Sequence, residues 1–208
     1  LAGSLMSLFG FFDVPEVWTL RHWSEVLSDS KFLVALRNTL IVSTSTAVIS
    51  VAAYSAIAYI IVRTEFTGRR VIAILSWLPF AIPGVILGLG YLWFVFGVPF
   101  LTPLYGTVWL LVIVNVLTVM SLGTQILQST MANLSLELEE AGRVSGANWT
   151  YIFRRVVIPL IAPTLIVVAI IAFVSAARQV ATVSILVVGN NHLLSTLQLN
   201  YLGGSEFE

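Results

Sequence analysis

Long apolar stretches alternate with short polar segments along this chain. Four of the stretches are long enough to cross a bilayer as helices, at residues 36–62, 71–96, 105–127 and 156–177. A spanning helix needs about 20 mostly apolar residues at 1.5 Å rise per residue. Apolar residues surround each predicted helix, and the period-two alternation typical of a membrane β-barrel is missing. The pattern predicts an all-α protein, a polytopic transmembrane helical bundle.

Composition and charge support a membrane protein. Of the 208 residues, 58% are hydrophobic and 10% are charged, whereas about a quarter of the residues in an ordinary soluble domain are charged. No Lys, Arg, Asp or Glu occurs between Arg70 and Glu137. An intramembrane enzyme would need ionisable catalytic groups at the depth of the spans, and no Asp, Glu or His is found there. The composition therefore favours a non-catalytic membrane protein.

Basic residues near the span ends indicate the orientation. If the 63–70 loop is cytoplasmic, alternation of the spans places the 129–155 loop on the same side. Six basic residues then lie inside and four outside, a modest excess in the direction of the positive-inside rule. The inner set is Arg63, Arg69, Arg70, Arg143, Arg154 and Arg155, and the outer set is Arg21, Lys31, Arg37 and Arg178.

The 129–155 loop is predicted to contain two short helices. Ser135 can cap the first, and three glutamates fill its first turn, where the positive end of the helix dipole favours carboxylates. Gly146 is predicted to end this helix, and Asn148 to cap the second. Pro159 then stands at the start of the next span.

Small residues in this loop indicate a contact surface. Ala141, Gly142 and Gly146 carry little side-chain bulk, so another backbone or a large side chain could approach closely. Such a surface suits a helix seated in a groove of a partner protein. A solvated connector at the membrane surface is the alternative interpretation.

The same loop resembles the signature of the integral membrane subunits of binding-protein-dependent ABC importers. In that signature Glu-Ala-Ala is followed after three residues by Gly, and after nine more by Ile-x-Leu-Pro. The corresponding residues here are Glu140-Ala141-Gly142, Gly146 and Val156-Val157-Ile158-Pro159, and the spacing matches at every step. Gly142 replaces the second Ala, Val156 the Ile and Ile158 the Leu, which keeps each position small or apolar.

Shorter motifs are similar to those of the ferric-iron permeases within this family. They lie at residues 10–13, 63–70 and 137–140. One position departs from the pattern, because Arg178-Gln179 stands where Arg-Glu is expected at the outer end of a span. The resemblance implies ferric iron as substrate, with phosphonate, sulfate, polyamine and thiamine permeases as alternatives.

The resemblance also implies a fold, a location and partners. The fold would be MetI-like, with a cytoplasmic coupling-helix pair, in a multi-pass protein of the bacterial cell inner membrane. Partners would be a dimer of ABC ATPase subunits, an extracytoplasmic solute-binding protein, the lipid bilayer, and a second permease subunit or a fused homologous half. No nucleic acid and no cofactor is expected. A separate ATPase would hydrolyse ATP, since the sequence has no Gly-x4-Gly-Lys-Ser/Thr loop.

The resemblance divides the chain into four regions. Residues 1–12 would be the tail of a preceding transmembrane helix, and residues 13–35 an extracytoplasmic segment. Residues 36–178 would form the MetI-like core, with four spans and the coupling loop at 129–155. Residues 179–208 would be an extracytoplasmic loop truncated before a final span.

Two sets of site residues are predicted. ATPase-coupling contacts are expected at Glu137, Glu140, Ala141, Gly142, Gly146 and Pro159. The translocation pathway is expected at Pro79, Pro83, Gly84, Asn115, Thr118, Ser121 and Gln125. The prolines each remove a helix hydrogen bond, and the polar residues recur every three or four positions and form one stripe. A stripe of this kind faces a cavity or holds helices together, and ordinary packing is the alternative for the prolines and glycines.

A channel or secondary transporter is the alternative function. Such a protein would usually place ionisable residues or a filter sequence in its spans, and it would not need a partner-shaped helix pair. No metal site is expected. His22 and His192 lack recognisable further ligands, and the sequence has no cysteine to supply a thiolate.

Overall fold

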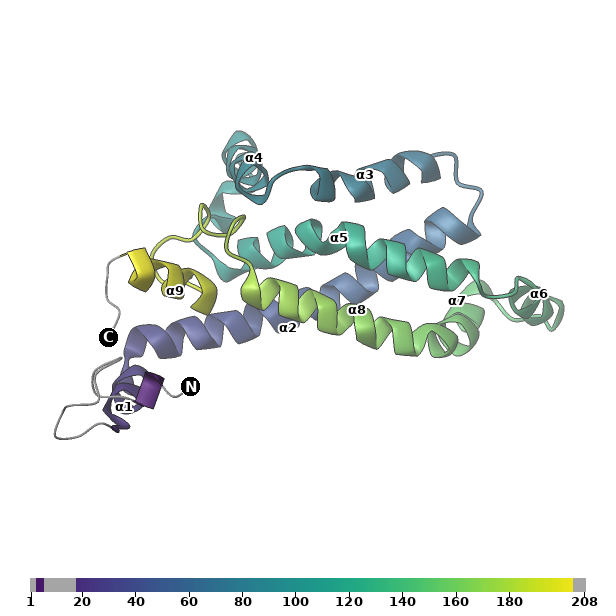
Figure 1. Cartoon of the computed structure of the whole chain (residues 1–208). Helices are drawn as coiled ribbons and strands as arrows, with labels where there is room; N and C mark the ends of the chain where they lie inside the picture. Colours follow the sequence, from purple (N-terminus) through teal and green to yellow (C-terminus); the bar gives the residue numbers. More distant parts are fainter. Residues whose placement is uncertain (1–2, 6–17, 204–208) are drawn as a thin grey trace.

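The computed structural model describes residues 3–5 and 18–203, and in these ranges it contains helices and no strand, which confirms the all-α prediction. Three helical runs are long and apolar enough to cross a membrane. They are α2 (Ser30–Arg63), α5 (Val108–Ala132) and the run Trp149–Arg178, which contains α8 (Ile158–Arg178). These three pack against one another along much of their lengths (Figure 1).

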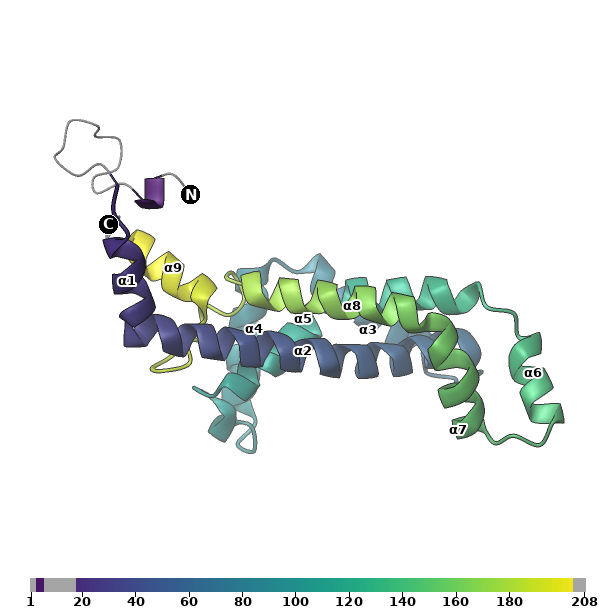
Figure 2. The ribbon, with the colours of Figure 1, turned by 90° about the horizontal axis from the view of Figure 1, so that it is seen from below.

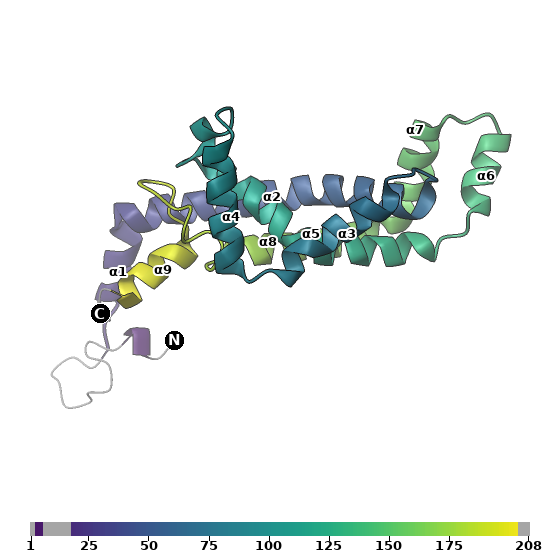
Figure 3. The same ribbon diagram turned by 90° about the horizontal axis from the view of Figure 1, so that it is seen from above.

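The predicted span at 71–96 is broken into two helices. The axes of α3 (Arg69–Ala81) and α4 (Gly84–Gly97) differ by 119°, so the pair forms either one broken span or a re-entrant segment. Pro79 lies inside α3 and Pro83 is the N-cap of α4, and neither has an N–H to donate to a helix. Figure 3 shows α4 crossing the bundle at a steep angle to α3.

Two glycines allow α4 to lie against the segment that follows α8. A Cβ atom added at Gly88 would lie 2.6 Å from the carbonyl oxygen of Thr182, and one added at Gly84 would lie 3.1 Å from Ala181 Cβ. Gly90, on the same helix, has open space around it. The direction of α4 is therefore set by a close backbone contact at Thr182 as well as by the proline break.

The buried core has two parts. One contains Val42, Leu111 and Leu186, and the other contains Tyr54 and Leu127. In the second part, α2 and α5 approach closely because Gly123 leaves room for the ring of Tyr54, whose hydroxyl donates a hydrogen bond to the carbonyl oxygen of Val116. These contacts hold α2 and α5 close together.

Short elements lie at the end of the bundle where α2 begins. They are η1 (Gly3–Leu5), α1 (Arg21–Ser28), η2 (Thr102–Leu104) and α9 (Leu194–Gly203). Asn38 Nδ2 donates hydrogen bonds to the carbonyl oxygens of Asn190 and His192, at 2.8 and 3.1 Å, which ties the segment before α9 to α2. Apart from η1, the predicted helix tail at 1–12 and the motif at 10–13 lie outside the described residues.

Candidate functional site

Two short helices lie beyond the ends of α5 and α8. They are α6 (Glu137–Val144) and α7 (Trp149–Ile152), and a π-helical turn, η3 (Phe153–Val157), leads from α7 into α8 (Figure 2). The predicted cap is confirmed, since Asn148 Oδ1 accepts a hydrogen bond from the Tyr151 N–H at 2.9 Å. Gly146 follows α6 with φ +81°, a left-handed conformation that favours glycine. Ser135 Oγ accepts from the Glu137 N–H at 3.2 Å, although Leu136 occupies the N-cap position.

The outer face of this helix pair combines carboxylates with apolar side chains. Glu137, Glu140 and Ala141 are exposed, as are Gly146 and Pro159. Exposed apolar side chains accompany them, among them Leu138, Trp149 and Tyr151, and Val144 has 89% of its surface exposed. Clustered apolar side chains ringed by polar groups are typical of a protein-binding surface.

Gly142 lies on the inner side of α6. A Cβ atom added there would lie 2.9 Å from Cγ1 and 3.1 Å from Cδ1 of Ile152, a side chain that is 2% exposed. The lack of a side chain at Gly142 therefore lets α6 pack closely on α7 within this chain. Its contact with an ATPase stays a prediction.

A buried ion pair connects α6 to α2. Arg63 Nε lies 3.4 Å from Glu139 Oε1, and the two side chains are 5% and 8% exposed. Tyr59, one turn before Arg63, donates a hydrogen bond from its hydroxyl to Glu139 Oε2 at 3.0 Å. The same hydroxyl accepts a hydrogen bond from Trp149 Nε1 at 2.8 Å.

Arg63 also caps the end of α5. Its Nη2 atom donates hydrogen bonds to the carbonyl oxygens of Met131 and Leu134, both at 2.7 Å. Carbonyl groups at a helix C-terminus lack partners in their own helix and carry partial negative charge, so a guanidinium is favourable there. One arginine thus contacts the ends of α5 and α6 from α2.

Aromatic rings complete the contact between α7 and α2. Trp149 and Phe153 stack with ring centroids 5.3 Å apart, and Tyr59 meets both rings edge-on, at 5.7 and 5.2 Å. Sequence reasoning missed this cluster, because Glu139 was assigned to the helix dipole. The spacing of Tyr59 and Arg63 by four residues, which places both on one face of a helix, is the signal that could have found it.

The predicted pathway residues lie in two places in the described structure. Asn115 and Ser121 are buried between helices, Thr118 and Gln125 are half-buried on α5, and Pro79, Pro83 and Gly84 lie at the α3–α4 break. Asn115 Oδ1 and Ser121 Oγ have no hydrogen-bond partner among the described residues. Neither cavity described below is lined by these residues, so their role in a pathway stays a prediction.

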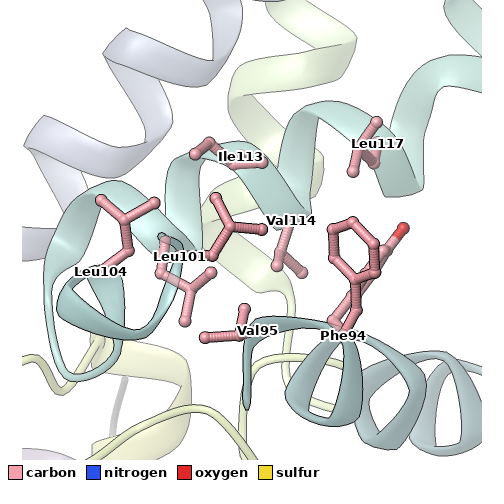
Figure 4. A pocket seen from close by; sticks show the side chains of 9 residues that line it. Phe94, Val95, Leu101, Leu104, Ile113, Val114 and Leu117 are labelled. Carbon is pink, nitrogen blue, oxygen red and sulfur yellow. The ribbon is translucent and has the colours of Figure 1, made fainter. Parts of the chain in front are cut away.

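A small apolar cavity of about 60 Å³ lies between α4 and α5. Figure 4 shows Phe94 and Val95 of α4 facing Ile113, Val114 and Leu117 of α5 across it. A second, more polar cavity of about 580 Å³ is lined by residues from the start of α2 and from the 189–201 segment, among them Lys31, His192 and Tyr201. No group of three or more His, Asp or Glu residues that could hold a metal ion occurs in the described ranges.

Comparison with known proteins gives consistent matches. Residues 48–204 match the family described as "Binding-protein-dependent transport system inner membrane component". The probable ABC transporter permease protein y4fN of Sinorhizobium fredii is 30% identical over 78% of this chain and 29% of its own length. The ferric transport system permease protein FbpB of Actinobacillus pleuropneumoniae is 28% identical over 73% of this chain and 22% of its own length. This chain thus spans less than a third of either relative.

Sugar permeases and a solved structure are also similar. The trehalose transport system permease protein SugB of Mycobacterium tuberculosis is 25% identical over 94% of this chain and 70% of its own length. A bacterial ABC transporter involved in the import of the acidic polysaccharide alginate matches all of this chain and 72% of its own chain, with a TM-score of 0.77 at 17% identity. At that identity the likeness shows the fold alone.

Proposed function

This chain belongs to the family of binding-protein-dependent transport system inner membrane components, and on that premise we propose that it is a permease subunit of an ATP-driven ABC importer. The observation that carries the proposal is the helix pair α6–α7. It lies at one end of the bundle with an exposed acidic and apolar face, while the buried Arg63–Glu139 ion pair and a hydrogen bond from Trp149 to Tyr59 fasten it to α2. A helix pair built in this way can dock on a partner and transmit force to the spans.

In this proposal the helix pair lies in the cytoplasm and seats on an ATPase dimer. Contact is made by Glu137, Glu140, Ala141, Gly142, Gly146 and Pro159. Closure of the ATPase dimer on ATP moves α6–α7, and the packed spans follow as a rigid-body tilt. A solute-binding protein delivers substrate to the outer side, and a second permease subunit or a fused homologous half completes the pathway.

Substitution of Glu140 tests this assignment. Glu140 is exposed on α6, so Glu140→Ala should leave membrane insertion and the amount of protein unchanged. We expect it to lower the ATPase activity stimulated by the binding protein by about 5-fold or more, within the usual range of coupling free energies. Glu65→Ala is the matched control, because Glu65 is an exposed glutamate in the loop before α3. Normal stimulation in the Glu140 variant would count against docking through this face.

For the substrate we propose ferric iron, with a di- or oligosaccharide as second candidate. Ferric iron is supported by the FbpB relatives and by the short motifs that resemble those of the ferric-iron permeases. The sugar is supported by relatives that this chain covers more fully, SugB among them, and by the uncharged hydroxyl and amide groups of the α5 stripe.

Stimulation of the complete importer distinguishes the two candidates. The importer in nanodiscs would be given its binding protein loaded with Fe³⁺, with trehalose or with maltodextrin, and ATP hydrolysis would be measured. Stimulation by the iron-loaded protein alone supports the first candidate, and stimulation by a sugar-loaded protein alone supports the second. Hydrolysis that responds to neither would refute both.

A further inference from the structure

We infer that Arg63 and Glu139 are positioning residues, whose buried ion pair is the joint that transmits movement of α6 to α2 and α5. The inference rests on the proposed permease function and adds the route by which the coupling loop reaches the spans. Neither residue belongs to the exposed docking face, since both side chains are almost fully buried.

The connectivity of the helix pair explains why α6 needs such a joint. α7 runs through η3 directly into α8, so a displacement of α7 passes to that span along one continuous run, Trp149–Arg178. α6 has no such continuation, because residues 133–136 separate it from α5 and residues 145–148 from α7. Without side-chain contacts, α6 could shift on its two connections and leave α2 and α5 in place.

The cluster supplies these contacts at three points. Glu139 is the only buried residue of α6. Its Oε1 atom lies 3.4 Å from Arg63 Nε, and its Oε2 atom accepts a hydrogen bond from the Tyr59 hydroxyl. Arg63 passes the displacement on to α5 through the carbonyl oxygens of Met131 and Leu134. The hydroxyl of Tyr59, shared with Trp149, keeps α6 and α7 in register.

A contribution to stability alone does not explain the buried Arg63–Glu139 pair. Desolvation of two charges offsets much of their attraction, and well-packed apolar residues often serve a protein equally well. A charged pair does offer directional contacts that hold one arrangement of the joint against others. Arg63 donates two hydrogen bonds from Nη2 to backbone carbonyl oxygens while its Nε atom lies 3.4 Å from Glu139 Oε1. A lysine ammonium is a compact point charge that cannot reproduce this spread of contacts.

Two conservative variants test the joint in the complete importer. Glu139→Gln keeps an acceptor for the Tyr59 hydroxyl and removes the charge, and Arg63→Lys keeps the charge and loses the fork. The controls are Glu65→Gln, an exposed glutamate in the loop before α3, and Arg69→Lys, whose side chain is exposed and donates to the Thr64 carbonyl oxygen. Each variant is assayed for docking, as a crosslink between a cysteine at Val144 and the ATPase, and for ATP hydrolysis stimulated by the loaded binding protein.

We expect both variants to dock normally while stimulated hydrolysis falls by about 5- to 150-fold, with both controls unchanged. Two results would overturn the inference. Stimulation within about twofold of the unaltered protein would show that the pair transmits nothing, and loss of docking would show that it only folds the loop. If the unaltered protein itself neither docks nor responds, the proposed function fails and the inference fails with it.

Discussion

The contact between Gly142 and Ile152 gives a prediction with a defined size. Gly142→Ala has two opposing effects on the helix pair. Alanine favours a helix over glycine by about 1 kcal/mol. The new Cβ would lie 2.9 Å from Ile152 Cγ1, and overpacking of this kind costs about 1–3 kcal/mol. We therefore expect Gly142→Ala to destabilise the α6–α7 pair by about 0–2 kcal/mol.

A double-mutant cycle separates the two effects. Ile152→Ala alone should cost about 2–5 kcal/mol, because the side chain is buried. In the Ile152→Ala background the clash is gone, so Gly142→Ala should stabilise α6 by about the full 1 kcal/mol of helix propensity. The cycle therefore predicts a coupling of about 1–3 kcal/mol between the two positions.

Hydrogen–deuterium exchange of the 137–153 peptides in nanodiscs measures these changes, since each 1.4 kcal/mol of local opening is about tenfold in exchange rate. Ala141→Leu, on the exposed side of α6, is the control and should change exchange little. If Gly142→Ala slowed exchange equally with Ile152 present and absent, the internal packing role of Gly142 would be refuted.

Two further predictions concern α4 and α7. Gly88→Ala should lower the thermal unfolding midpoint in detergent, because the added Cβ would lie 2.6 Å from the backbone oxygen of Thr182. Overpacking of this kind costs about 1–3 kcal/mol. Gly90→Ala is the control, because its Cβ meets open space and should not lower the midpoint. An equal effect at both glycines would contradict the close packing of α4 on Thr182 at Gly88. Asn148→Ala removes the cap of α7 and should cost about 1 kcal/mol, seen as roughly fivefold faster exchange at the Tyr151 amide. Unchanged exchange there would mean that the cap does not hold α7.

Features set by local chemistry could be predicted from the sequence. The all-α class follows from apolar runs long enough to span a bilayer as helices. The end of α6 and the start of α7 follow from Gly146 and Asn148. Both depend on residues within one or two turns of the feature. Proline at positions 79 and 83 likewise predicted a weak point in the second span.

Features that depend on distant segments could not be predicted. The prolines alone do not determine the angle between α3 and α4, because this angle of 119° also reflects the contact of Gly88 with Thr182. The pairing of Arg63 with Glu139 requires two segments far apart in sequence to meet, so the sequence alone assigned Glu139 only to the helix dipole. The small size of Gly142 was predicted to leave room for a partner protein. In the structure it leaves room for Ile152 of the same chain.

The central claim is that α6–α7 docks on an ATPase, and a crosslink tests it most directly. The sequence has no cysteine, so a single one can be placed at Val144, which is 89% exposed, in the complete protein, and a second in the surface groove of the ATPase. Ser184→Cys is the control, because Ser184 is exposed in the segment between α8 and α9, at the other end of the bundle. The account predicts a crosslink at position 144 that changes with ATP, and none at position 184. No crosslink at position 144 with or without ATP, with both proteins present in the membrane, would contradict it.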